Sequence, residues 1–148
     1  MFERPTTIPA QRIALLACVC ASLAASATAA QTPPPLNQEP HINASLIAAS
    51  IGEIILRKCD SISPRYLVVF SKVKALEAYA RELGYTEAEV EAFLDSRDEQ
   101  KRVRQAANKY LIEQGAVKGD DESYCAAGRA EIEKGTLTGE MLWVSGLE

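Results

Sequence analysis

Few residues of this 148-residue chain have the types and spacing that catalysis or metal binding requires. His41 is the only histidine, which excludes every site that needs two imidazole groups. The zinc-protease motif H-E-x-x-H, paired C-x-x-C and the nucleophile motif G-x-S-x-G are absent. We therefore expect no catalytic, cofactor-binding or metal-binding residue, and interpret the protein as a non-enzyme.

Two patterns resemble catalytic groups but lack their surroundings. His41 lies in a proline-rich stretch, where we expect no partners that orient its ring. Residues 71–74 match the S-x-x-K motif of penicillin-recognising enzymes, but the helical period puts Ser71 on the solvent side and the companion motifs are missing. Carboxylates are plentiful, so a small hydrolase with a carboxylate pair is kept as the third functional alternative.

The first part of the chain has the order of a secretory signal peptide. Arg4 and Arg12 precede an uncharged run, residues 13–30, which ends in small side chains. The A-x-A rule favours cleavage after Ala29 and, as a second choice, after Ala30.

Removal of residues 1–29 would place the mature protein in the bacterial periplasm or outside the cell, with no stable membrane span. Lipidation of Cys18 is the alternative. It is disfavoured because two apolar residues separate Arg12 from the box before this cysteine, against about 7–15 in a typical signal. The net charge of −4 becomes −5 when two basic residues and one acid leave with the signal. This acidity argues against a nucleic acid or an anionic membrane as partner.

Cys59 and Cys125 are the cysteines that the mature chain keeps. An even number of cysteines in an oxidising compartment predicts a disulfide. The bridge would close a loop of about 66 residues and stabilise the fold by roughly 4 kcal/mol. Two buried free thiols are the alternative, whereas a redox-active pair would need the C-x-x-C spacing.

Helical periodicity begins after residues 30–42, a proline-rich segment that we expect to be an extended lead-in. Asn43 is the expected N-cap of the first helix. Ser63 and Pro64 have the types of an N-cap and a first helical residue for a second helix, which ends before Gly84. The buried stripes of these two helices are expected to be Ile47, Ile51, Ile54 and Ile55 in the first, and Tyr66, Val69, Val73, Leu76, Ala80 and Leu83 in the second.

Further caps mark three more helices. Residues 86–89 form a capping box that opens a short third helix, and residues 96–99 repeat the pattern for a fourth. The acidic residues 120–122 favour the start of a fifth helix, which ends at Gly135. No window alternates as a half-buried strand does. The apolar run 67–70 resembles a buried strand, but its flanks continue the helical period.

The sequence thus predicts an all-α domain, residues 43–148, built as a small bundle of about five helices. One intramolecular disulfide joins the first helix to the last main helix, and Gly128 permits their close approach. Residues 137–144 are either a turn of helix or a docking tail. The candidate interaction patch in this last piece is Met141, Leu142, Trp143 and Val144; packing of these residues onto the core is the alternative.

Three segments follow one another in a recognisable order: residues 51–59, residues 78–89 with the turn L-G-Y-x-x-A-E, and residues 124–139 around Cys125. In this order the chain resembles a family of small exported bacterial proteins, the domain of unknown function 5333 family, over about residues 36–142. The resemblance implies an exported protein with one domain. It implies no activity and no site residue.

These observations favour an exported, non-catalytic helical protein that acts in the periplasm by binding or as an accessory. Its protein partner is unknown, and its oligomeric state is left open. An acid-stress chaperone is the alternative function, because protonation of the carboxylates would leave the domain strongly positive and self-repulsive.

Overall fold

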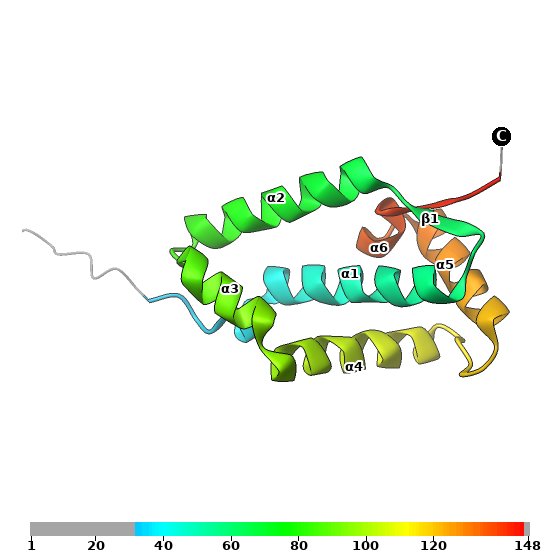
Figure 1. Cartoon of the computed structure of the whole chain (residues 1–148), viewed down its shortest axis with the longest axis horizontal. Helices are drawn as coiled ribbons and strands as arrows, with labels where there is room; N and C mark the ends of the chain where they lie inside the picture. Colours follow the sequence, from blue (N-terminus) through cyan, green and yellow to red (C-terminus); the bar gives the residue numbers. More distant parts are fainter. Residues whose placement is uncertain (1–31, 147–148) are drawn as a thin grey trace, which may run out of the picture. The chain divides into compact units, whose positions relative to one another are not determined.

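The computed structural model of the protein describes residues 32–146 (Figure 1). The predicted signal peptide, its cleavage sites at Ala29 and Ala30, and Cys18 lie outside the described residues. Within the described range the chain forms six α-helices, a 3-10 turn and two short strands, all in one compact unit. In chain order these are η1 (Leu36–Gln38), α1 (Pro40–Lys58), β1 (Ile62–Pro64), α2 (Tyr66–Glu82), α3 (Glu87–Asp95), α4 (Arg97–Glu113), α5 (Asp121–Lys134), α6 (Leu137–Glu140) and β2 (Leu142–Val144).

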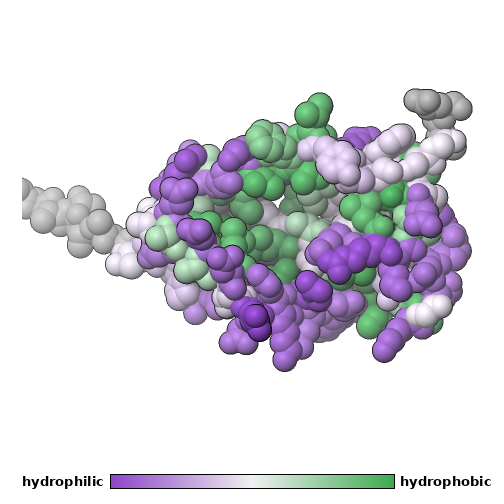
Figure 2. Space-filling view, viewed as in Figure 1, coloured by the Kyte–Doolittle hydropathy of each residue, from purple (hydrophilic) through white to green (hydrophobic). Residues whose placement is uncertain are grey.

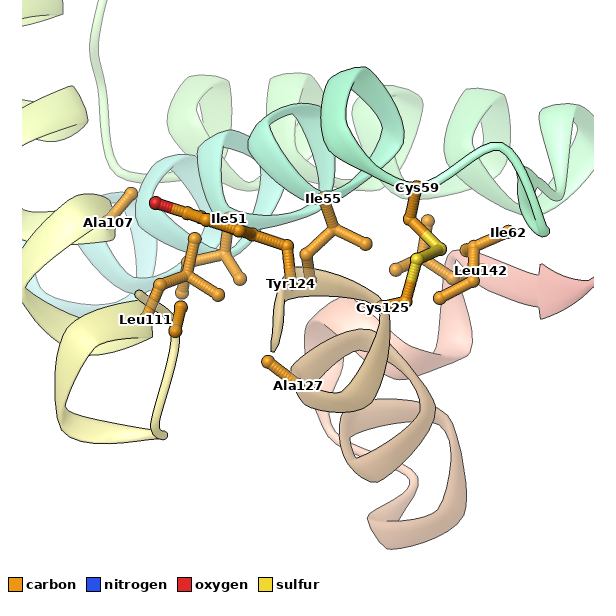
Figure 3. Packing of buried hydrophobic residues seen from close by; sticks show 11 residues of the cluster. Ile51, Ile55, Cys59, Ile62, Ala107, Leu111, Tyr124, Cys125, Ala127 and Leu142 are labelled. Carbon is orange, nitrogen blue, oxygen red and sulfur yellow. A yellow bond between two sulfur atoms is a disulfide. The ribbon is translucent and has the colours of Figure 1, made fainter. Parts of the chain in front are cut away.

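Helix α1 is the central element of the fold. It packs against α4 along its length, against α6 near its middle and against α5 near its C-terminal end (Figure 1). Ile51 and Ile55, two residues of the predicted stripe, are buried in one cluster with Leu111 of α4 and Tyr124 of α5 (Figure 3). Burial of such aliphatic side chains stabilises a fold by about 1.5–3 kcal/mol each. The mostly helical fold that the sequence predicts is therefore confirmed.

Cys59 and Cys125 form the disulfide that the cysteine count predicts, with their Cα atoms 5.1 Å apart. It joins the end of α1 to the first half of α5, beside the main core cluster (Figure 3). Gly128 of α5 makes this close approach possible. A Cβ atom at Gly128 would lie 2.7 Å from Ile55 Cγ2 and 2.5 Å from Ile62 Cδ1, closer than van der Waals contact permits.

The prediction of an extended lead-in is wrong for the last residues of that segment. Helix α1 begins at Pro40, three residues before the expected N-cap Asn43. The actual N-cap is Glu39, whose carboxylate accepts a hydrogen bond of 2.6 Å from the Ile42 N–H. Leu36, Ile42, Ala80 and Tyr85 then form a second, smaller core cluster. The segment is ordered because these apolar side chains bury it against α2, a contact between distant residues that no local pattern reveals.

The prediction that Ser63 and Pro64 start the second helix is wrong: both residues lie in strand β1. This strand pairs antiparallel with β2, in a register that sets Ile62 opposite Val144 and Pro64 opposite Leu142. The prediction failed because a three-residue strand is too short to show alternation, and its partner lies at the far end of the chain.

The predicted cap of α3 and the stop of α5 are confirmed, whereas the capping box predicted for α4 is only half formed, because the Glu99 carboxylate bonds Asn37 and Arg102 instead. Thr86 and Glu89 form the reciprocal capping box at the start of α3, and the Ser96 hydroxyl accepts from the Glu99 N–H at the start of α4. Gly135 ends α5 with φ +60°, a left-handed conformation that disfavours side chains with a Cβ.

Candidate functional site: the exposed face of helix α2

Helix α2 is attached to the body of the protein at both of its ends. Near its C-terminal end, the Tyr79 hydroxyl donates a hydrogen bond of 3.0 Å to the Glu39 carboxylate. The His41 ring packs edge-on against the Tyr79 ring, with 4.7 Å between their centroids. The proline-rich segment, His41 included, therefore anchors this end of α2.

The N-terminal end of α2 is held by the last residues of the fold. The Arg65 N–H donates to the Met141 carbonyl oxygen at 2.8 Å, directly next to the β1–β2 pair. About two turns further along, Lys72 Nζ lies 2.5 Å from a carboxylate oxygen of Glu140. Two attachments from different parts of the chain thus fix the position of the helix.

Between these attachments α2 presents large apolar side chains to solvent. Leu67 is 87% exposed, Tyr66 77%, Phe70 62% and Val73 48%. We call these four residues the α2 face. Figure 2 shows apolar surface along the α2 edge and around the hollow beneath it. Apolar patches of this kind are uncommon on monomeric proteins and mark interaction sites.

The prediction of the buried stripe of α2 is therefore partly wrong. Ala80 is buried, and Val69 and Leu76 are half-buried, but Tyr66, Val73 and Leu83 are exposed. The helix is apolar nearly all round over its first turns, so the periodicity does not decide which side meets the core. The apolar run 67–70 was the available signal, because it adds Leu67 and Phe70 to the apolar side chains of the stripe.

The charges around the α2 face are basic. Arg65 precedes it, Lys74 lies beside Phe70, and Lys72 points to Glu140 of the body. Glu77 is the first acid of the helix. Lys74 Nζ lies 5.8 Å from the Phe70 ring centroid, a cation–π distance, and also pairs with the Glu77 carboxylate at 2.8 Å. Lys72 and Lys74 are each paired with a carboxylate, so the α2 face is an apolar surface bordered by two ion pairs and by Arg65.

The predicted interaction patch at the end of the chain is largely absent from the surface. Met141 and Leu142 are buried, and Leu142 belongs to the main core cluster (Figure 3). Val144 is half-buried in the small sheet. Leu142 turns inward because residues of a strand alternate between faces. Only Trp143, which is 40% exposed, stays available, and its register partner Ser63 lies just before α2.

The remaining candidates from the sequence are Ser71 and groups that could bind a metal ion. Ser71 is exposed, as predicted, and its hydroxyl donates to the Val68 carbonyl oxygen at 2.8 Å. Within residues 32–146, no three His, Cys, Asp or Glu side chains gather in a way that would hold a metal ion. None of the described helices is both long and apolar enough to cross a membrane.

Surface pockets border α3 on several sides. The first, of about 440 Å³, lies between α1, α3 and α4 on the apolar side chains of Leu46, Phe93 and Val103. The second, of about 400 Å³, lies between α2 and α3. The charged side chains that line the second pocket are Lys74, Glu77, Arg81, Glu87, Glu91 and Asp95. A third pocket, of about 500 Å³, lies between α3 and the proline-rich segment.

The fold lowers the pKa of several carboxyl groups. The pKa of Glu89 is lowered because the backbone N–H and the hydroxyl of Thr86 donate to its carboxylate. Arg102 donates to Glu99 at 2.6 Å and likewise lowers the pKa of that carboxyl. A general acid needs a raised pKa, so these groups do not favour a hydrolase.

At Glu39, burial acts to raise the carboxyl pKa. Hydrogen bonds from the Ile42 N–H and the Tyr79 hydroxyl outweigh it, so the pKa lies below its ordinary value. The hydrogen bond between Tyr79 and Glu39 also raises the pKa of the Tyr79 phenol. The anchor of α2 at this end is therefore built around an ionised carboxylate.

Comparison with known protein families matches residues 34–143 to a family described as "Family of unknown function (DUF5333)". The chain belongs to this family. The resemblance inferred from the sequence is confirmed, and the matched residues include the disulfide, the α2 face and both attachments of α2. Membership of the DUF5333 family brings no activity, since its description assigns none. Comparison with curated proteins gives no match, and neither does comparison with solved structures.

Proposed function

We propose that this DUF5333 protein is an exported, non-catalytic binding or accessory protein of the bacterial periplasm, and that the α2 face is its docking surface. The observation that carries the proposal is the exposure of Tyr66, Leu67 and Phe70 on one well-anchored helix. Because the helix is fixed at both ends, these apolar side chains stay in solvent, which is unfavourable in free energy. A partner that covers the surface would offset this unfavourable term.

Export is supported by the order of residues 1–29 and by the disulfide. Disulfides persist in oxidising compartments and are rare in the bacterial cytosol. Cys59 and Cys125 join the first helix to the fifth, so the bond ties together distant parts of the fold.

The docking function is tested by placing a photo-crosslinking amino acid at position 67 in cells that export the protein. Lys101, an exposed residue of α4 on another surface, is the matched control position. We expect a discrete adduct from position 67 and none from position 101. The double substitution Leu67→Glu/Phe70→Glu, with a probe at Tyr66, should abolish the adduct. Equal labelling from positions 67 and 101 would contradict the proposal.

An acid-stress chaperone is the second candidate, and the Glu39 anchor is the observation that favours it. Protonation of this carboxylate would weaken the hydrogen bonds that tie α2 to the start of α1. The smaller core cluster around Leu36 and Tyr85 would then become accessible. Binding of an apolar dye that rises reversibly below pH 4, with helical content retained, is the expected result for this function. A protein that binds no dye at this pH is not such a chaperone.

A further inference from the structure

We propose that the partner of the α2 face is a second copy of this chain, with the two α2 helices packed antiparallel across a twofold axis near Phe70. This inference rests on the docking role proposed above and names its partner. Helix α2 forms one edge of the described unit, with no other described element beyond it (Figure 1). A second copy can therefore reach the α2 face without displacing any part of the fold.

The spacing of the exposed residues suits such a pairing. Tyr66, Phe70, Val73 and Glu77 follow one another at helical intervals of three or four residues, so they form one stripe along α2. When a copy of the stripe is reversed against itself, Phe70 of each copy meets Val73 of the other. Each contact then occurs twice, as a twofold interface requires.

The charges favour the antiparallel direction. The first half of α2 and the residue before it carry three bases, Arg65, Lys72 and Lys74, and no acid. The second half carries two acids, Glu77 and Glu82, and one base, Arg81. Antiparallel packing brings Arg65 of one copy near Glu77 of the other, where it would join the existing Lys74–Glu77 pair. It also sets the two helix dipoles in opposite directions, which is the favourable arrangement. Parallel packing would set the basic halves against each other.

The available area predicts a reversible dimer rather than a permanent one. Full burial of the four side chains of the α2 face removes roughly 500 Å² of apolar surface per copy, or about 1,000 Å² in total. This is the lower limit for specific interfaces, and such complexes dissociate readily. Trp143, next to the start of α2, lies where it can extend the contact.

The test is sedimentation velocity of the processed, oxidised protein from low micromolar to submillimolar concentration. We expect the average mass to rise from that of one chain towards that of two. Leu67→Glu/Phe70→Glu should weaken the dimer at least ~10-fold. Ile112→Glu is the matched control, because Ile112 is an exposed large apolar residue on α4, away from the α2 face. This variant should dimerise as the wild type does.

The direction of packing is tested by charge reversal. Arg65→Glu should weaken the dimer, and the double variant Arg65→Glu/Glu77→Arg should restore it. Because Leu67 and Phe70 are exposed, their substitution should leave the thermal melting temperature unchanged. If a Glu variant does melt earlier, Leu67→Gln/Phe70→Gln replaces it in the comparison.

The outcomes separate this inference from the docking function. A protein that stays monomeric at all concentrations, yet still forms the adduct from position 67, binds a different partner, and the second copy is refuted. A dimer that survives Leu67→Glu/Phe70→Glu uses another surface and also refutes it. A monomer without any adduct refutes the docking function as well. Binding to anionic vesicles in place of dimerisation would assign the α2 face to a lipid surface and overturn the inference.

Discussion

The hydroxyl group of Tyr110 on α4 donates a hydrogen bond of 2.8 Å to Oε1 of Glu131 on α5. The Glu131 side chain is buried, and the Thr136 hydroxyl donates to its other oxygen. Two hydroxyl groups from different elements thus satisfy one buried carboxyl group. They link α4, α5 and the start of α6 through a polar contact inside an otherwise apolar core.

Removal of the phenolic donor should destabilise the fold. Tyr110→Phe leaves Glu131 Oε1 without this hydrogen bond in a site that water reaches poorly, which costs about 1–3 kcal/mol. Urea denaturation of the two proteins measures the difference. Tyr66→Phe is the control, because the Tyr66 side chain is exposed and should change the stability little. Equal stabilities of wild type and Tyr110→Phe would show that the contact contributes nothing.

The same contact should be visible in an alkaline titration. The hydrogen bond to Glu131, together with burial and the negative charge, raises the pKa of Tyr110 from 10.0 to about 12. The stability that Tyr110 contributes is present below pH 10 and is lost as the pH rises towards 12. The pKa values of Tyr79 and Tyr85 are raised as well, so the tyrosinate absorbance of the folded protein should show more than one late step. In Tyr110→Phe one of these steps should be missing, while the others stay.

Acid should weaken the fold through Glu39. Its folded pKa lies below the ordinary value of 4.5, so its contribution is present above pH 4.5 and is lost as the pH falls through the folded pKa. Glu39→Gln keeps an acceptor for the Ile42 N–H but does not titrate. The stability of this variant should consequently fall less steeply below pH 4.5 than that of the wild type. Glu133→Gln, at an exposed position, should follow the wild-type curve.

The disulfide should contribute strongly to stability. Cys59→Ala/Cys125→Ala opens a loop with a sequence separation of 66 residues, and we expect a loss of about 4 kcal/mol. The chain-entropy estimate is an upper value when the unfolded chain keeps residual structure. Intact mass before and after reduction checks that the bond is present in the protein. A reduced protein with unchanged unfolding midpoint would contradict this prediction.

Three glycines should respond differently to the same substitution. Gly139→Ala would set a Cβ 1.9 Å from the Glu131 carbonyl oxygen, so α6 cannot keep its position. Gly128→Ala meets Ile62 and Ile55 side chains and should cost about 1–3 kcal/mol. Gly52→Ala is the control, because its Cβ finds ordinary contacts beyond 3.4 Å. We expect it to be neutral or stabilising by up to about 1 kcal/mol, as measured by thermal unfolding.

The local features of the fold could be read from the sequence. The capping box of Thr86 and Glu89, the Ser96 cap and the stop at Gly135 each depend on residues within one or two turns of each other. The pairing of Cys59 with Cys125 followed from the count of cysteines left after the predicted cleavage, and needed no geometry.

Tertiary contacts decided the rest, above all the candidate site. The apolar first turns of α2 have no single apolar side, so only the attachments at Glu39 and Met141 determine that Leu67 and Phe70 face solvent. Glu39 is a weak cap by residue type, and Tyr79 from another helix supplies part of its stabilisation. The sequence alone determined the caps of the later helices, because those signals are local, and the cross-link, because two cysteines remain after the predicted cleavage. Which face each helix buries depends on residues far apart in the chain.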